Sequence, residues 1–293
     1  MVSKPSFFLA TSRLGRRSAL VGLGILGGFA ALGATALLGA CASDSTGGQR
    51  VVLNTRLGLS ESSASGFTTG LGWTVTVTKA LVSTGSFAYF DGAPPTVQAP
   101  RHRNWKFAQR LLGLNVAHAH PGHYAAGGTL GDMLENWSVD LLAGTVDLPV
   151  GEGITGTYRS ARFSLHAPPE GPLASALEGH VALVEGVAEK NGQEPRYFRA
   201  TADEADLAQN VKEGAVDGCE FSVADVQGNG TVTVLVHLDV WFNLVDFSEL
   251  EPGSEEAPSE FPSDSQPRLA FAQDLTQLSA YKFSFSAASG MKP

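Results

Sequence analysis

The chain has 293 residues, of which 43% are hydrophobic and 17% charged, and its formal net charge is −9. This length suffices for one large domain or two small ones. The acidic charge argues against nucleic acid as a partner and against broad contact with anionic lipid, because both would be repelled.

The first predicted element is an export signal over residues 1–40. The first 17 residues hold four basic side chains and no acidic one, and residues 18–40 carry no charge. The run ends at Leu38-Gly39-Ala40-Cys41, the small-residue-then-cysteine pattern of a bacterial lipobox. A basic start, an apolar middle and a small-residue cleavage site are typical of export signals. We expect Cys41 to be acylated and to anchor the chain to a bacterial membrane, facing the periplasm or the exterior.

The type of signal is open to two further interpretations. Residues 15–20, Gly-Arg-Arg-Ser-Ala-Leu, resemble a twin-arginine signal, which exports folded proteins. The 23 uncharged residues could also form an uncleaved transmembrane helix, but the cysteine at their end favours a lipid anchor. Cleavage would leave residues 41–50 as a short tether on a chain with 16 basic and 29 acidic residues, a formal charge of −13. With Cys41 acylated, Cys219 has no partner, and its alternating surroundings predict a buried thiol on a strand.

Period-two alternation predicts an all-β domain over residues 51–293. The clearest strand begins at residues 73–78, Trp-Thr-Val-Thr-Val-Thr, where β-branched residues alternate between two faces. Strands are predicted at 51–59, 71–90, 138–148, 157–166, 181–188, 197–202, 219–226 and 231–238, and short helices at 104–114, 203–211, 240–250 and 271–278. Turns at Asn191-Gly192 and Gly228-Asn229-Gly230 predict two hairpins. The expected fold is an antiparallel β-sandwich, immunoglobulin-like or related, with Trp73 and Phe163 in its core.

Two segments interrupt this pattern. Residues 91–136 are predicted to be one long inserted loop, and such loops are usually functional or disordered. Residues 249–267 hold six acidic residues and four prolines, which predicts a solvated loop. Calcium binding is an alternative for this second segment, but its carboxylates lack the spacing of a coordinating loop.

The inserted loop contains the strongest chemical candidate, the pattern H-x-H-x-x-H at residues 118–123. Neutral imidazole is the commonest protein ligand for zinc and copper, and the Pro-Gly turn inside the pattern would let three rings converge. The predicted metal ligands are His118, His120 and His123, with Tyr124, Asp132 or Glu135 as supplementary ligands, or a distant His102, His166 or His237. In the alternative interpretation, these histidines hydrogen-bond to backbone carbonyl groups around a tight turn.

Catalytic motifs give little support for an enzyme. Residues 279–282, Ser-Ala-Tyr-Lys, match the S-x-x-K of serine acyltransferases, but they begin a predicted strand, where no helix aligns the lysine with the serine. No G-x-S-x-G, H-E-x-x-H or P-loop motif occurs in the sequence. We therefore expect a non-enzymatic protein.

Several short stretches carry a resemblance to known families. Residues 72–76 (GWTVT), 117–124 (AHAHPGHY) and 138–142 (SVDLL) resemble a group of uncharacterised lipoproteins of myxobacterial type. Residues 156–163 (GTYRSARF), 241–242 (WF) and 246–247 (DF) are more distantly similar to the MbnP-like copper-binding family. That family consists of exported β-sandwich proteins paired with di-haem partners, so the resemblance implies copper. This chain departs from the family because the disulfide-forming cysteines are absent.

Two functions of different classes follow. The first is a lipid-anchored, non-enzymatic protein that binds copper or zinc through the histidine cluster. The second is a structural or interaction module that binds no metal and presents a loop to another envelope protein.

Overall fold

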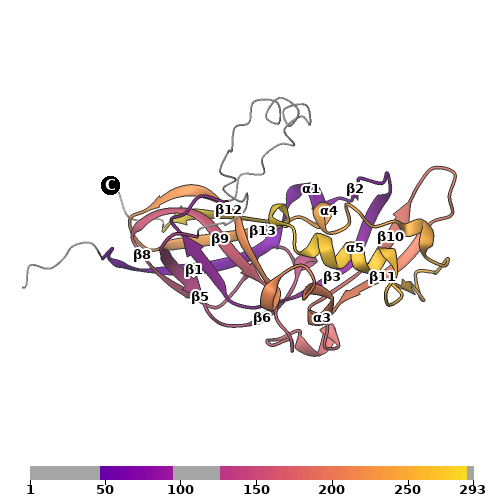
Figure 1. The fold of residues 1–293 in the computed structure, drawn as a ribbon, viewed down its shortest axis with the longest axis horizontal. Helices are drawn as coiled ribbons and strands as arrows, with labels where there is room; N and C mark the ends of the chain where they lie inside the picture. The colour runs from indigo at the N-terminus through magenta and orange to yellow at the C-terminus, as the bar shows by residue number, and fades with distance from the viewer. Residues whose placement is uncertain (1–46, 95–125, 289–293) are drawn as a thin grey trace, which may run out of the picture. The chain divides into compact units, whose positions relative to one another are not determined.

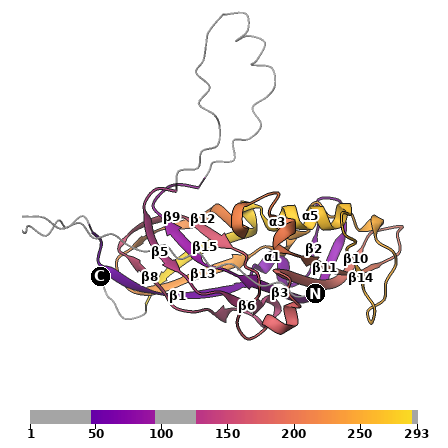
Figure 2. The ribbon, with the colours of Figure 1, turned by 60° about the horizontal axis from the view of Figure 1, so that its bottom comes forward.

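The computed structural model describes residues 47–94 and 126–288, and it places them in two β-sheets with a few short helices (Figures 1 and 2). Strands make up 45% of these residues and helices 18%, which confirms the expected all-β class. Within the described ranges, no helix is long and apolar enough to span a membrane.

The larger sheet closes on itself. Its nine strands run in the order β13-β15-β12-β9-β4-β5-β8-β1-β7, and β13 also pairs with β1, so eight strands form a ring to which β7 is attached. The strands are β1 (Arg50–Leu59), β4 (Phe87–Phe90), β5 (Thr129–Met133), β7 (Val146–Asp147), β8 (Gly151–Ile154), β9 (Gly156–Ser164), β12 (Ala215–Val226), β13 (Gly230–Val236) and β15 (Tyr281–Ala287).

The smaller sheet has six strands and lies beside helix α5. Its order is β14-β11-β10-β3-β2, with β6 pairing to the far end of β3. Its strands are β2 (Phe67–Thr68), β3 (Thr74–Thr84), β6 (Trp137–Asp140), β10 (Ala182–Glu189), β11 (Arg196–Ala202) and β14 (Ser259–Glu260). The α-helices of the described residues are α1 (Glu61–Ala64), α3 (Glu204–Leu207), α4 (Leu238–Trp241) and α5 (Gln266–Leu275). Single turns of 3-10 helix occur at η1 (Leu141–Ala143), η2 (Ala174–Leu177), η3 (Lys212–Gly214), η4 (Phe247–Glu249) and η5 (Leu278–Ala280).

One hydrophobic core joins the two sheets and α5, and it is rich in aromatic side chains. Phe163 of β9 stacks on Tyr281 of β15 with ring centroids 3.8 Å apart. On the smaller sheet, Phe198 of β11 packs against Phe247, and Trp73 meets Phe247 edge to face. Trp73 and Phe163 are both fully buried, which confirms the core predicted for them.

The ring of strands leaves no room for a side chain at Gly153 of β8. A Cβ atom there would lie 2.5 Å from the Tyr158 hydroxyl and 2.8 Å from Leu53 Cδ1. That hydroxyl lies 2.9 Å from the carbonyl oxygens of Leu130 and Ile154, which accept its hydrogen bonds. Glycine is therefore needed where the Tyr158 hydroxyl lies against β5 and β8.

The predicted antiparallel sandwich is not confirmed in detail. The larger sheet closes, and three strand pairs, β1–β13, β12–β15 and β11–β14, are parallel. The hairpin at Asn191-Gly192 is confirmed, since β10 and β11 pair antiparallel on either side of it.

The second predicted hairpin, at Gly228-Asn229-Gly230, is wrong. The flanking strands β12 and β13 do not pair, because the C-terminal strand β15 lies between them, parallel to β12 and antiparallel to β13. Asn229 instead joins other parts of the chain: its side-chain oxygen accepts the Val52 N–H at 2.8 Å, and its carbonyl accepts the Ala288 N–H at 3.1 Å.

Both segments predicted as loops contribute strands. Residues 91–136 include β5, which pairs with β4 and β8 in the larger sheet. Residues 249–267 include β14, which pairs with β11, and Phe261, which is buried in the core. Composition alone therefore did not predict these two features. β5 occupies a central position in the larger sheet, and Phe261 places one aromatic ring in the core from a mostly polar stretch.

The other predicted elements are shifted or divided. Residues 138–148, predicted as one strand, form β6, η1 and β7, because Asp140 caps the 3-10 turn by accepting the Leu142 N–H at 2.9 Å. The helix expected at 203–211 is the shorter α3. The helix expected at 240–250 is α4, which is shorter and begins earlier, and the one expected at 271–278 is α5, which also begins earlier.

Candidate functional site

The predicted sites are only partly described by the structure. Cys41, His118, His120, His123 and Tyr124 lie outside the described residues, as does the helix predicted at 104–114. The supplementary ligands Asp132 and Glu135 are described: Asp132 lies on β5, and Glu135 lies two residues after the end of β5. The features nearest to the histidine cluster are therefore the residues that flank residues 95–125.

Hydrogen bonds join the two flanks of that segment at the β4–β5 hairpin. The Gly92 N–H donates to the Ala126 carbonyl at 2.9 Å, and the Asp91 N–H donates to the Gly128 carbonyl at 3.2 Å. The Asp91 carboxylate in turn accepts the Gly128 N–H at 2.7 Å. The chain therefore leaves the larger sheet and returns to it at adjacent points.

Asp132 belongs to the β5 strand of this hairpin and lies beside a second carboxylate. It is directly opposite Glu152 of β8 in the sheet register, with Ala88 of β4 on its other side. Partial burial, and then the negative charge of Glu152, raise the pKa of Asp132 above its usual value. Like charges directly across two strands are unfavourable, so a cation would be bound favourably here. Glu135 is exposed beyond the end of β5.

The histidines that the structure describes are separate from one another and paired with carboxylates. His166 Nε2 lies 3.4 Å from Glu170 Oε1, and His237 Nδ1 lies 3.6 Å from Asp239 Oδ1. Across residues 47–94 and 126–288, no three His, Cys, Asp or Glu side chains are grouped as a metal site would require.

Two other predicted features can be placed. Cys219 is fully buried on β12, which confirms the predicted buried thiol on a strand, and burial raises the pKa of this thiol to about 12. In the S-x-x-K match, Lys282 Nζ lies 3.5 Å from Glu220 Oε1, so its ammonium pairs with a carboxylate of β12.

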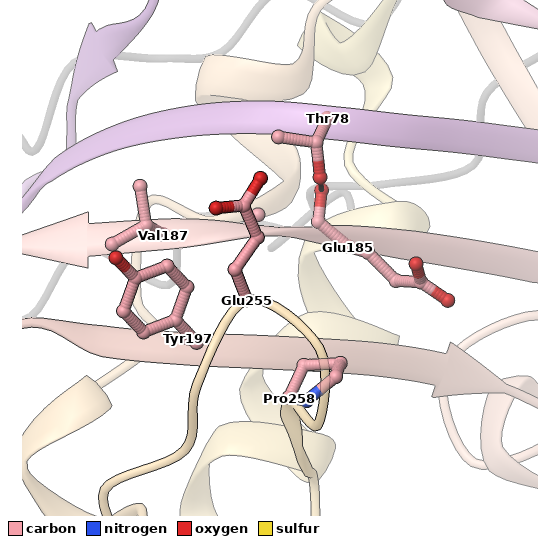
Figure 3. A pocket seen from close by; sticks show the side chains of 7 residues that line it. Thr78, Glu185, Val187, Tyr197, Glu255 and Pro258 are labelled. Carbon is pink, nitrogen blue, oxygen red and sulfur yellow. Dashed lines mark hydrogen bonds between the residues drawn. The ribbon is translucent and has the colours of Figure 1, made fainter.

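A groove of about 200 Å³ lies on the outer face of the smaller sheet (Figure 3). It is lined by residues of β3, β10 and β11 and of the loop before β14: Thr78, Glu185, Val187, Tyr197, Glu255 and Pro258. Figure 3 shows Glu255 reaching from this loop over β10, beside the Tyr197 ring.

The charges around this groove compensate one another. Glu185 Oε1 lies 3.5 Å from Lys79 Nζ and 3.7 Å from Arg199 Nε. Arg199 also lies 2.8 Å from Glu178 and 3.9 Å from Glu260. This ladder of alternating charges joins β3, β10, β11 and β14, so Glu185 and Arg199 are already paired within the sheet.

A larger cleft, of about 380 Å³, lies where β2, α4, α5 and η5 meet. Its polar lining consists of Thr68, Asp239, Asn243, Asp274, Gln277 and Ser279. Lys, Arg and His are absent from the described lining. This cleft, which we call the α4–α5 cleft, is the candidate site that the sequence analysis missed.

Asp274 is the unusual residue of the α4–α5 cleft. It is only 1% exposed, and its Oδ2 atom accepts the Leu244 N–H at 2.8 Å. Burial raises the pKa of this carboxyl group to about 6. Perturbed carboxyl groups in clefts are candidates for functional residues. The sequence does carry a signal for it, since Asp274 stands three residues after Phe271 and next to Leu275, on the face of α5 that packs into the core.

Comparison of the chain with protein-family models, curated proteins and solved structures finds no match.

Proposed function

We propose that this chain is an exported, lipid-anchored envelope protein that binds one copper or zinc ion without catalysing a reaction. The observation that carries the proposal is the density of imidazoles, His118, His120 and His123 within six residues. The described flanks support it, because Gly92 and Ala126 are hydrogen-bonded at 2.9 Å and so hold both ends of the segment at one hairpin.

Carboxylates near that hairpin would assist the binding of a cation. Asp132 and Glu152 lie opposite each other on β5 and β8, with unfavourable charge repulsion that a bound cation would relieve. We propose Tyr124, Asp132 and Glu135 as supplementary ligands. The MbnP-like resemblance favours copper over zinc. The sandwich architecture of that family belongs to the same proposal, and the hydrophobic core that joins both sheets supports it.

Metal titration of the detergent-solubilised full-length protein tests the site. We expect one copper or zinc ion per chain at pH 7.5 and weaker binding below about pH 6.5, because ligating imidazoles must be neutral. A triple variant, with His118, His120 and His123 each changed to Ala, should lose this ion. The control is His180→Ala, which removes a histidine that lies 2.6 Å from Asp203 and is not among the candidate ligands. Equal binding by the triple variant and the wild type would reject the site.

The anchor is tested separately. Cys41→Ala should release the protein from membranes or leave its signal uncleaved. Unchanged mass together with unchanged membrane retention would instead favour a spanning helix at residues 18–40.

Exposed apolar side chains support the second candidate, an interaction module. Leu134 is 71% exposed and Val150 is 60% exposed, and they lie just outside the adjacent ends of β5 and β8, each two residues from Asp132 or Glu152 along the chain. Contiguous exposed apolar surface rimmed by polar residues marks protein contacts, and in this second proposal the two side chains belong to such a surface. If no metal binds, crosslinking in intact cells should capture an envelope protein, and the double change of Leu134 and Val150 to Ser should abolish that capture.

A further inference from the structure

The geometry points to a binding site for a small aliphatic amine in the α4–α5 cleft, where the carboxylates of Asp274 and Asp239 would accept hydrogen bonds from its ammonium group. This inference does not depend on the metal proposal, because none of the residues involved belongs to the histidine segment.

The size of the cleft suits a small molecule. Its volume of about 380 Å³ falls within the range of roughly 300–1,000 Å³ that is typical of ligand sites. Val240 and Leu244 add apolar surface to the lining, and Leu244 is 40% exposed. An aliphatic chain would contact these two side chains while its charged end meets the carboxylates.

The charge of the cleft calls for a cation. Asp274 is buried with no basic side chain within ion-pair distance among the described residues, and no Lys or Arg occurs between residues 213 and 267. Only Oδ2 of Asp274 has a hydrogen-bond donor in the described part of the chain, the Leu244 N–H. Burying a carboxylate is costly unless it is paired. An ammonium group would supply the missing positive charge and donate to Oδ1.

The second carboxylate is already held in place. Asp239 Oδ1 accepts the Ser63 hydroxyl at 2.8 Å and the Ser62 hydroxyl at 3.3 Å, and His237 Nδ1 lies 3.6 Å away. Asn243 is also fixed, since its Oδ1 atom accepts the Gly70 N–H at 3.1 Å. Side chains that are held before a ligand arrives lose little conformational freedom on binding.

An amine fits this lining better than a metal ion. The described residues contain no group of three acidic, His or Cys side chains that could hold a metal, and two carboxylates alone do not complete a coordination shell. An ammonium group has three donors. The two carboxylates and the side-chain oxygen of Gln277 supply acceptors for them.

Calorimetric titration of the full-length protein at pH 7.5 tests the inference with a matched pair of probes. 1,4-Diaminobutane carries ammonium groups, and 1,4-butanediol has the same carbon chain without charge. We expect the diamine to bind and the diol to bind at least tenfold more weakly, as charge-assisted hydrogen bonds require. The pH is above the value of about 6 to which burial raises the pKa of Asp274, so this carboxylate is ionised.

Variants assign the binding to the cleft. Asp274→Asn and Asp239→Asn should each weaken diamine binding at least tenfold. Asp225→Asn is the matched control, because Asp225 is exposed on β12, away from the cleft lining, and its carboxylate accepts the side-chain N–H of Gln227. Circular dichroism checks that each variant is folded. The inference is overturned if the diamine does not bind, if the diol binds equally well, or if neither cleft variant weakens binding. Calcium binding that requires Asp274 and excludes the diamine would also overturn it, in favour of a metal site.

Discussion

Glu185 and Asp274 are two acidic residues that this fold removes from water in different ways. The Glu185 side chain is 25% exposed, and it lies 3.5 Å from Lys79 and 3.7 Å from Arg199 on neighbouring strands. Asp274 is 1% exposed, and among the described residues only the Leu244 N–H, at 2.8 Å, donates to it. The charge of Glu185 is already paired with two cations within the sheet. Asp274 has a single backbone donor in the described part of the chain, so its carboxylate retains the capacity to bind a cation. The predictions below test this difference, beginning with the largest expected effect.

Removing the largely buried cation of Arg268 should cause the largest loss in the free energy of unfolding. The Arg268 side chain is 15% exposed, with Nη2 2.7 Å from Asp203 and 2.8 Å from Asp206. Arg268→Met would leave both carboxylates without this partner. Because the Asp203 and Asp206 side chains are 43% and 23% exposed, we expect a loss at the lower end of the range for buried pairs, about 3 kcal/mol. Urea unfolding at pH 7.5 measures the loss. A loss below about 1 kcal/mol would mean that ion pairing does not stabilise the paired carboxylates of this fold.

Asp274→Asn should instead raise the free energy of unfolding. Burial raises the pKa of Asp274 from 3.8 to about 6, so the folded state binds this proton more tightly than the unfolded state does. The free energy of unfolding therefore falls as the pH rises from about 4 to about 6. The variant lacks this fall, and its amide oxygen can still accept the Leu244 N–H.

The expected result is a variant more stable than the wild type by roughly 3 kcal/mol at pH 7.5 and equally stable at pH 4. Urea unfolding at a series of pH values measures this difference. Parallel pH profiles for the two proteins would show that Asp274 is not a strained carboxylate, and the contrast with Glu185 would then disappear.

Glu185→Gln should destabilise the protein slightly. The change removes the charge that Lys79 and Arg199 share, at distances where a partly exposed pair contributes at most about 1 kcal/mol. Measured beside Asp274→Asn at pH 7.5, the two neutralised carboxylates should move the free energy of unfolding in opposite directions. A stabilising Glu185→Gln would remove the distinction between them.

Local patterns predicted those parts of the fold that depend on neighbouring residues. Alternation at residues 73–78 predicted the start of β3, because one face of that strand is buried and the other meets solvent. The turn at Asn191-Gly192 likewise set the β10–β11 hairpin, where Gly192 has a φ of 77°. Both signals are local and therefore readable in the sequence.

Long-range pairing explains the errors. The turn at residues 228–230 predicted a β12–β13 hairpin, but β15, which starts about fifty residues later, pairs with both strands. No residue near the turn indicates that β15 will pair with these two strands. β5 was missed because its sequence, Thr-Leu-Gly-Asp-Met, has little β-propensity and becomes a strand through β4 and β8.

The candidate sites divide in the same way. The density of histidines at residues 118–123 is visible in the sequence, whereas convergence of their rings on one ion depends on the fold. Asp274 is one acidic residue in a short helix, and its burial depends on α4 and β11, which pack against α5 from distant parts of the chain. A cleft whose walls are far apart in sequence has no local signature.

The prediction with the smallest expected effect tests whether burial or distance sets the strength of an ion pair. Arg56 Nε lies 2.6 Å from Asp147 Oδ1, closer than either cation of Glu185, but the two side chains are 51% and 75% exposed. Water screens such a pair, and holding two long side chains in one geometry costs entropy. Arg56→Met should therefore lower the free energy of unfolding by no more than about 0.5 kcal/mol, and even this difference should vanish in 1 M salt, where the screening length is about 3 Å. Urea unfolding at low and high salt measures both values. A loss as large as that of Arg268→Met would show that hydrogen-bond length, and not burial, sets the strength of the ion pairs in this protein, and the contrast between Glu185 and Asp274 would then need another explanation.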